Sequence, residues 1–123
     1  MHIVEQTQEG VIIDAYAQDS VSINGQTHNN SLIILPKTGV QAWPISDIAS
    51  INIADCQCFE DPSIEVILIG HQAKSSAHIN HEVRLHFASR ATGIEVMDIG
   101  AACRTYNILA SEGRVIAAGF IFG

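Results

Sequence analysis

Hydrophobic residues in the first third of the chain form short runs that are separated by turn-forming residues. The runs are rich in Val, Ile and Leu, which is typical of strands. The strongest turn signal is Asn24-Gly25, because both residues tolerate a positive φ and favour a two-residue hairpin. The pattern therefore predicts a hairpin-rich part with these strands: Val11 to Tyr16, Val21 to Ile23, Gln26 to His28, Ser31 to Leu35 and Val40 to Trp43.

The second half of the chain alternates between apolar runs and segments with helical spacing. Strands joined by helices of this length indicate parallel crossovers, so we expect a βαβαβ unit. The last two strands lack a polar alternation, which predicts that both faces of the sheet are covered. The expected elements are the strand Ile64 to Gly70, the helix Ile79 to Thr92, the strand Ile94 to Asp98, the helix Ala101 to Glu112 and the strand Arg114 to Phe122.

Three segments carry weaker patterns. In Pro44 to Asp61, Ser46 or Asp47 can cap a short helix, residues 51–53 read as extended, and residues 54–59 read as a helical turn. Residues 1–10 are expected to form a lead-in, and residues 71–78 a polar connection between elements. The absence of repeats, linkers and low-complexity runs predicts a single domain over residues 1–123.

The helix predicted at Ala101 to Glu112 has the most informative pattern. Asp98 can accept backbone N–H bonds at its start, Gly100 permits a tight turn before it, and Gly113 is suited to end it. Its apolar face consists of Ala102, Tyr106, Leu109 and Ala110, with Cys103 at the margin. Ile108 and Ala101 lie away from this face, so they make either a second internal contact or a surface for a partner.

Composition and charge exclude several classes of function. The formal net charge is −7, and the six Lys and Arg residues are scattered, so the phosphate neutralisation that nucleic-acid binding needs is missing. An anionic membrane surface is disfavoured for the same reason, and the apolar runs are far shorter than a membrane span. The first residues lack the features of a signal or transit peptide, and three Cys residues indicate reduced thiols, so we expect a cytoplasmic protein.

The candidate chemistry lies after two of the predicted parallel strands. Ligands in open α/β sheets bind beyond the carboxyl ends of strands, which here are Gly70-His71 and Asp98 to Gly100. The amides at the start of the second helix favour an anion, and Arg104 and Thr105 add donors. Arg104 is alternatively a structural charge paired with Asp98, Glu95 or Glu112. No nucleotide phosphate motif is present in the sequence.

Thiols and histidines are weaker candidates. Cys103 is expected in the first turns of a helix, where the dipole lowers a thiol pKa, but catalysis needs an activating base that only a distant His71 can supply. Tyr106 and Asn107 are interpreted first as packing and helix-edge contacts. His78, His81 and His86 lack a metal-binding motif, and Cys56-x-Cys58 lacks a second pair, so neither a metal nor a cofactor is expected.

The segment EVMDIGAACRTYNIL, followed by EGRVIAA, resembles the signature of the Mth938-like family (the DUF498 domain). SINGQTHNNSLIILP and SIEVILIG are similar to the family's N-terminal and central motifs, so the resemblance covers nearly the whole chain. It implies one compact α/β domain with a mixed sheet, and a relationship to a mitochondrial complex I assembly factor. Family members usually carry a Gly-Thr-Gly type turn after the central strand, whereas this chain has Gly70-His71-Gln72.

These observations lead to two hypotheses about function. The first is a non-enzymatic domain that binds another protein, or a second copy of itself, as an assembly accessory. The second is a small-molecule or anion-binding protein, or an enzyme, with a pocket at the strand ends. The candidate binding residues for the two hypotheses together are Gly70, His71, Asp98, Gly100, Cys103, Arg104, Thr105, Tyr106, Asn107 and Ile108.

Overall fold

The computed structural model describes residues 10–72 and 78–122, so most of the expected lead-in and polar connection lies outside the described residues. The hairpins predicted in the first third are confirmed, with Asn24 and Gly25 at positive φ. The elements, in chain order, are β1 (Ile13–Ala17), β2 (Ser20–Ile23), β3 (Gln26–His28), β4 (Leu32–Leu35), β5 (Gly39–Ala42), the 3-10 helices η2 (Ile48–Ser50) and η3 (Ala54–Phe59), β6 (Val66–His71), α1 (His81–Ala88), β7 (Gly93–Asp98), α2 (Ile99–Ser111) and β8 (Ile116–Phe120).

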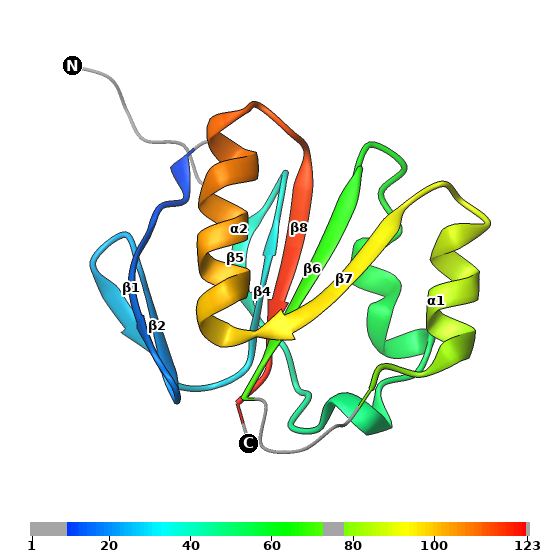
Figure 1. Cartoon of the computed structure of the whole chain (residues 1–123), viewed down its shortest axis with the longest axis horizontal. Coiled ribbons are helices and arrows are strands. Elements are labelled where there is room, and N and C mark those ends of the chain that lie inside the picture. The colour runs from blue at the N-terminus through cyan, green and yellow to red at the C-terminus, as the bar shows by residue number, and fades with distance from the viewer. Residues whose placement is uncertain (1–9, 73–77, 123) are drawn as a thin grey trace.

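The strands form two sheets (Figure 1). The hairpins β1–β2–β3 make a small antiparallel sheet of their own. The larger sheet has the order β5-β4-β8-β6-β7 and is mixed, because β6 pairs in parallel with β7 and β8 while β4 is antiparallel to β8. The predicted βαβαβ unit is confirmed as β6-α1-β7-α2-β8, and its last strand returns past β6 to lie beside β4.

Two hydrophobic cores lie on opposite faces of the five-stranded sheet, and alternating side chains of its strands feed both of them. On β6, for example, Leu68 belongs to the core under α2 and the β1–β2 hairpin, whereas Ile67 and Ile69 belong to the core under α1, η2 and η3. Figure 1 shows α2 and α1 on different sides of the sheet. The expectation of two covered faces, which was drawn from the last two strands, is therefore confirmed for β8, and the central strand β6 is buried in the same way.

The cover is only partial at β7, which lies at the edge of the sheet and is half-buried, with Met97 packed against one core and Ile94 and Val96 against the other. Its apolar residues resemble those of a central strand, but a strand's place in the sheet depends on long-range pairing. The first helix is also shorter than predicted. Asn80 accepts a hydrogen bond from the backbone N–H of Glu82 (2.8 Å) and so starts α1 after Ile79, and Ala91 takes a positive φ beyond its end.

The region between β5 and β6 contains the short helices that the sequence suggested. Asp47 caps η2 by accepting from the Ala49 N–H (3.1 Å). Trp43 anchors the region, because its indole N–H donates to the Asp55 carbonyl (3.1 Å) and its ring packs edge-on against Phe59. The indole needs Gly119 beneath it, since a Cβ there would lie 2.5 Å from Cζ3 of Trp43.

Candidate functional site

Helix α2 starts directly at the end of β7, where Asp98 caps it. The Asp98 carboxylate accepts a hydrogen bond from the Ala101 N–H (2.8 Å), as the sequence predicts for a residue in this position. Asp98 is also paired in register with His71 at the end of the neighbouring β6. The fold therefore brings the two predicted strand ends together. His71 itself belongs to β6 rather than to the loop that follows it.

Arg104 lies one turn into α2 and points toward β1. Its Nη1 donates to the hydroxyl of Tyr16 (2.6 Å), and its guanidinium carbon lies 5.8 Å from the centre of the Tyr16 ring. The expected pairing of Arg104 with Asp98, Glu95 or Glu112 is wrong for the part of the chain that the structure describes. The prediction failed because the actual partner, Tyr16, is 88 residues away in sequence and becomes adjacent only in the fold.

Two glycines at the candidate site serve close packing. Gly70 is buried, and a Cβ there would lie 2.9 Å from the Cβ of Ala102 and 3.0 Å from Cδ1 of Phe120, so its lack of a side chain lets α2 approach the sheet. Gly100 was predicted to lie in a tight turn before the helix, but it belongs to the first helical turn of α2. A Cβ at Gly100 would lie 2.8 Å from the Tyr16 ring, so this glycine makes room for the Tyr16–Arg104 contact.

Cys103 and Tyr106 face the core beneath α2 and are fully buried, so neither can touch a partner or ligand at the surface. Burial raises the pKa of the Cys103 thiol to about 12, which the nearby Arg104 only partly offsets. At neutral pH this thiol is not ionised and is not a nucleophile. Burial also raises the pKa of Tyr106, whose hydroxyl has no hydrogen-bond partner among the described residues.

Two polar residues of α2 are engaged with neighbouring strands. The Asn107 amide bridges to β1, donating to the Ile13 carbonyl (3.0 Å) and accepting from the Ile13 N–H (3.4 Å). The Thr105 hydroxyl donates to the sulfur of Met97 on β7 (3.6 Å). These contacts hold α2 between β1 and β7.

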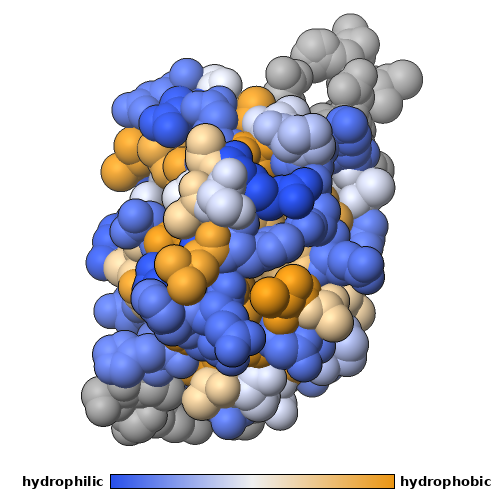
Figure 2. Space-filling view, turned by 90° about the vertical axis from the view of Figure 1, so that its right-hand side faces the viewer, coloured by the Kyte–Doolittle hydropathy of each residue, from blue (hydrophilic) through white to orange (hydrophobic). Residues whose placement is uncertain are grey.

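Ile108 is 58% exposed on the outer side of α2, so of its two possible roles an internal contact is wrong. Leu85 of α1 is exposed to a similar extent, 55%, on the other side of the sheet. Figure 2 shows that side of the molecule, where hydrophobic areas are small and separated by hydrophilic ones. On the α2 side, Ile12 (59%) and Tyr16 (44%) are also exposed, the latter beside Arg104.

A hollow of about 400 Å³ lies between the start of β1 and the last turns of α2. Its lining includes Ile12, Asn107, Ser111 and Arg114, and none of His71, Asp98 or Arg104. It is therefore at the opposite end of α2 from the strand ends where a ligand pocket was hypothesised. Arg114 at its rim is already paired with Glu65 (2.7 Å).

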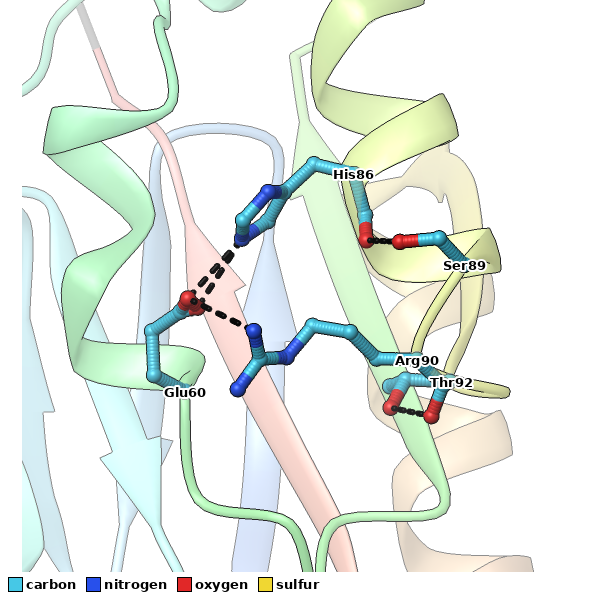
Figure 3. Close-up of polar contacts among 5 residues, drawn as sticks. All are labelled: Glu60, His86, Ser89, Arg90 and Thr92. Atoms are coloured by element: carbon cyan, nitrogen blue, oxygen red, sulfur yellow. Dashed lines mark hydrogen bonds and ion pairs between the residues drawn. The ribbon is translucent and has the colours of Figure 1, made fainter.

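The described histidines lie apart from the cysteine pair of Cys56 and Cys58, with His86 on α1 and the cysteines on η3. Within residues 10–72 and 78–122, no group of three His, Cys, Asp or Glu side chains is placed to hold a metal ion. His86 contacts the Glu60 carboxylate at 2.8 and 3.0 Å, and Arg90 lies 3.8 Å from it, so these side chains tie η3 to α1 (Figure 3). Burial raises the pKa of Cys56 to about 12 and that of Cys58 to about 11.

Two residues that the sequence analysis did not propose for the site belong to the α2 surface. Tyr16 holds Arg104, and its only signal in the sequence is an aromatic residue near the end of a predicted strand. Ile12, which directly precedes β1, lines the hollow, and the sequence alone does not show that it faces the end of α2. No helix among the described residues is long and apolar enough to cross a membrane.

Comparison with known proteins gives consistent results at the levels of sequence and fold. A family model described as "Protein of unknown function (DUF498/DUF598)" matches residues 13–121. A Danio rerio protein named NADH dehydrogenase (ubiquinone) 1 alpha subcomplex assembly factor 3 is 30% identical over 119 residues, which cover 95% of this chain and 67% of the relative. The Rattus norvegicus protein of the same name is 30% identical, with 92% of this chain and 61% of the relative covered.

Solved structures have the same architecture. An NMR structure of a Xanthomonas campestris protein matches with a TM-score of 0.81 and 30% identity, covering 92% of this chain and 85% of that one. A Bordetella pertussis protein described as a Mth938-like domain matches with a TM-score of 0.74 and 23% identity, covering 98% of this chain and 90% of that one. The expected Mth938-like α/β fold is thereby confirmed.

Proposed function

Because the chain belongs to the DUF498/DUF598 family, we propose that it is a non-enzymatic accessory protein that binds other proteins during the assembly of a larger complex. Support comes from the relatives named as NADH dehydrogenase assembly factors, which align along nearly all of this chain. The chain spans 67% and 61% of the length of the two relatives above, so the transfer of their role is itself part of the proposal. We propose the cytoplasm as its location.

The observation that carries this proposal is the exposure of Ile108 on a rigid helix. Ile108 stands at the outer side of α2 with 58% of its surface in solvent, and Arg104 lies one turn before it. Tyr16 fixes the Arg104 guanidinium, and Asn107 ties the helix to β1. An apolar side chain beside a pre-positioned guanidinium is typical of the central contacts of protein interfaces.

The alternative of a ligand pocket at the strand ends has less support. In this alternative the guanidinium of Arg104 donates to a bound anion, but in the structure it points toward Tyr16. Cys103 is buried and un-ionised at neutral pH. The space beside Gly70 is occupied by Ala102 and Phe120. The hollow at the other end of α2 does not include the strand-end residues.

The experiment is affinity capture from native lysate with three forms of the chain: wild type, Ile108→Glu and Leu85→Glu. Leu85 is the matched control, since it is equally exposed but lies on α1 across the sheet. We expect wild type and Leu85→Glu to retain NADH dehydrogenase subunits or their assembly intermediates, identified by mass spectrometry, and Ile108→Glu to lose them. Circular dichroism must show that both variants are folded. Equal capture by all three forms would contradict the assignment to α2, and capture of no such protein by wild type would contradict the assembly role.

A further inference from the structure

The outer side of α2 carries a periodic arrangement of side chains. The residues that point away from the core are spaced three or four apart, which places them in one stripe along the helix. The exposed members are Arg104, Ile108, Ser111 and the cap residue Glu112, and the half-buried Ala101 and Thr105 lie at the margins of the stripe. Apart from Arg104, Ile108 and Glu112 the stripe is made of small side chains, which allow another helix to approach closely.

The two charges of this stripe are opposite and symmetric about Ile108. Arg104 precedes Ile108 by four residues and Glu112 follows it by four, so each lies about 6 Å from Ile108 along the helix axis. Neither takes part in an ion pair with another described residue. The hydroxyl of Tyr16 occupies one N–H of Arg104, and a guanidinium has five, so the others are available to a carboxylate.

A surface with this arrangement complements itself. If two α2 helices pack antiparallel with a two-fold axis at Ile108, each Arg104 faces Glu112 of the other copy, and each Thr105 faces Ser111. The two Ile108 side chains then meet at the axis and leave water together. Isologous contacts of this kind, in which one patch serves both copies, are the commonest basis of protein dimers.

We infer that the chain which occupies the α2 surface is a second copy of this protein, held by an Ile108–Ile108 contact and two Arg104–Glu112 ion pairs. This inference rests on the proposed function in taking α2 as the contact surface. One surface holds one chain at a time, so an assembly partner that uses α2 must displace the second copy. Ile12, which directly precedes β1, and Tyr16 on β1 are also exposed and add apolar surface beside α2.

The experiment measures the dimer dissociation constant by sedimentation for wild type and for variants with reversed charges. Arg104→Glu and Glu112→Arg each place like charges opposite one another, and each should weaken the dimer by about tenfold or more. The double variant Arg104→Glu/Glu112→Arg restores opposite charges and should return the constant toward that of wild type. Glu82→Arg on α1 is the control for a change in net charge and should have little effect.

A cross-link tests the two-fold axis independently. Treated with diamide as the oxidant, Ile108→Cys should form a disulfide-linked dimer, whereas Leu85→Cys on α1 should not. A wild-type protein that is monomeric at all accessible concentrations overturns the inference. So does a dimer whose dissociation constant is unchanged in both single charge reversals, or a double variant that does not regain the dimer. If the protein is monomeric and Ile108→Glu still loses a captured NADH dehydrogenase subunit, the proposed function stands without the second copy. If the dimer forms as described and nothing is captured, the dimer stands without the proposed function.

Discussion

Replacing Tyr106 with Phe removes a single hydroxyl from the core between α2 and the sheet. The Tyr106 side chain is fully buried, and its hydroxyl oxygen has no hydrogen-bond partner within residues 10–72 and 78–122. The folded protein therefore loses the hydrogen bonds that water gives this group in the unfolded chain. Such a loss costs about 1–3 kcal/mol, so Tyr106→Phe should raise the free energy of unfolding by that amount.

The corresponding change in melting temperature follows from the size of the chain. An unfolding entropy of about 2.1 cal/mol/K per residue gives about 0.26 kcal/mol/K for 123 residues, so each kcal/mol raises Tm by about 4 °C. Urea unfolding followed by circular dichroism, with an unchanged m value, measures the free energy directly. A calorimetric scan measures Tm on the same samples.

Tyr16→Phe is the matched control, because its hydroxyl does have a partner. It accepts a hydrogen bond from Arg104 at 2.6 Å on a partly exposed surface. Its loss should lower the free energy of unfolding by about 0.5–1.5 kcal/mol, which is opposite in sign to the effect at Tyr106. If Tyr106→Phe instead destabilises the protein by a similar amount, the Tyr106 hydroxyl has a hydrogen-bond partner and the reasoning is refuted.

Three further predictions concern other parts of the fold. Gly119→Ala should destabilise the protein by about 1–3 kcal/mol in urea unfolding, because its Cβ meets the Trp43 ring, whereas Gly93→Ala, with open space around it, should have almost no effect. Asp98→Ala should cost about 1 kcal/mol by the same assay, because α2 loses its cap, and Asp98→Asn should keep most of that stability. Burial raises the pKa of Cys103 from an ordinary value near 9.0 to about 12, so the neutral thiol contributes stability that is fully present below pH 9 and is lost as pH rises toward 12. The decline in the free energy of unfolding, measured by urea unfolding at each pH, should be shallower in Cys103→Ala. An equal slope in both proteins would contradict the burial of this thiol.

Local signals in the sequence predicted the elements well where short-range chemistry decides them. Asn24-Gly25 makes the hairpin, Asp98 caps α2, and Gly113 ends it with a positive φ. The C-terminal end of α1 was placed too late because residues of ordinary helical propensity follow Ser89. Ala91 nevertheless has a positive φ, which is not helical and which the residue type does not predict.

The candidate site was predicted less well, because its contacts join distant parts of the chain. The sequence places Arg104 and Ile108 on one helix but does not show that β1 lies beside them. That neighbour gives Arg104 the Tyr16 hydroxyl in place of a carboxylate, and it explains the small residue at Gly100. The burial of Tyr106 and Cys103 could be predicted from their helical spacing. The exposure of Ile108 could be decided only from the three-dimensional structure.

The position of β8 has a consequence for how the protein folds during synthesis. β8 lies between β4 and β6, so it joins the β4–β5 hairpin to the β6–β7 pair, yet it is the last strand of the sheet to leave the ribosome. Until Ile116 to Phe120 emerge, β4 and β6 each keep an unpaired edge, and neither core can close. Folding must therefore wait for contacts of long sequence separation, which slow it and leave apolar strands open to aggregation in the meantime. A nascent chain stalled before residue 116 should be far more sensitive to protease than the full chain stalled behind an added C-terminal linker that lets β8 leave the ribosome.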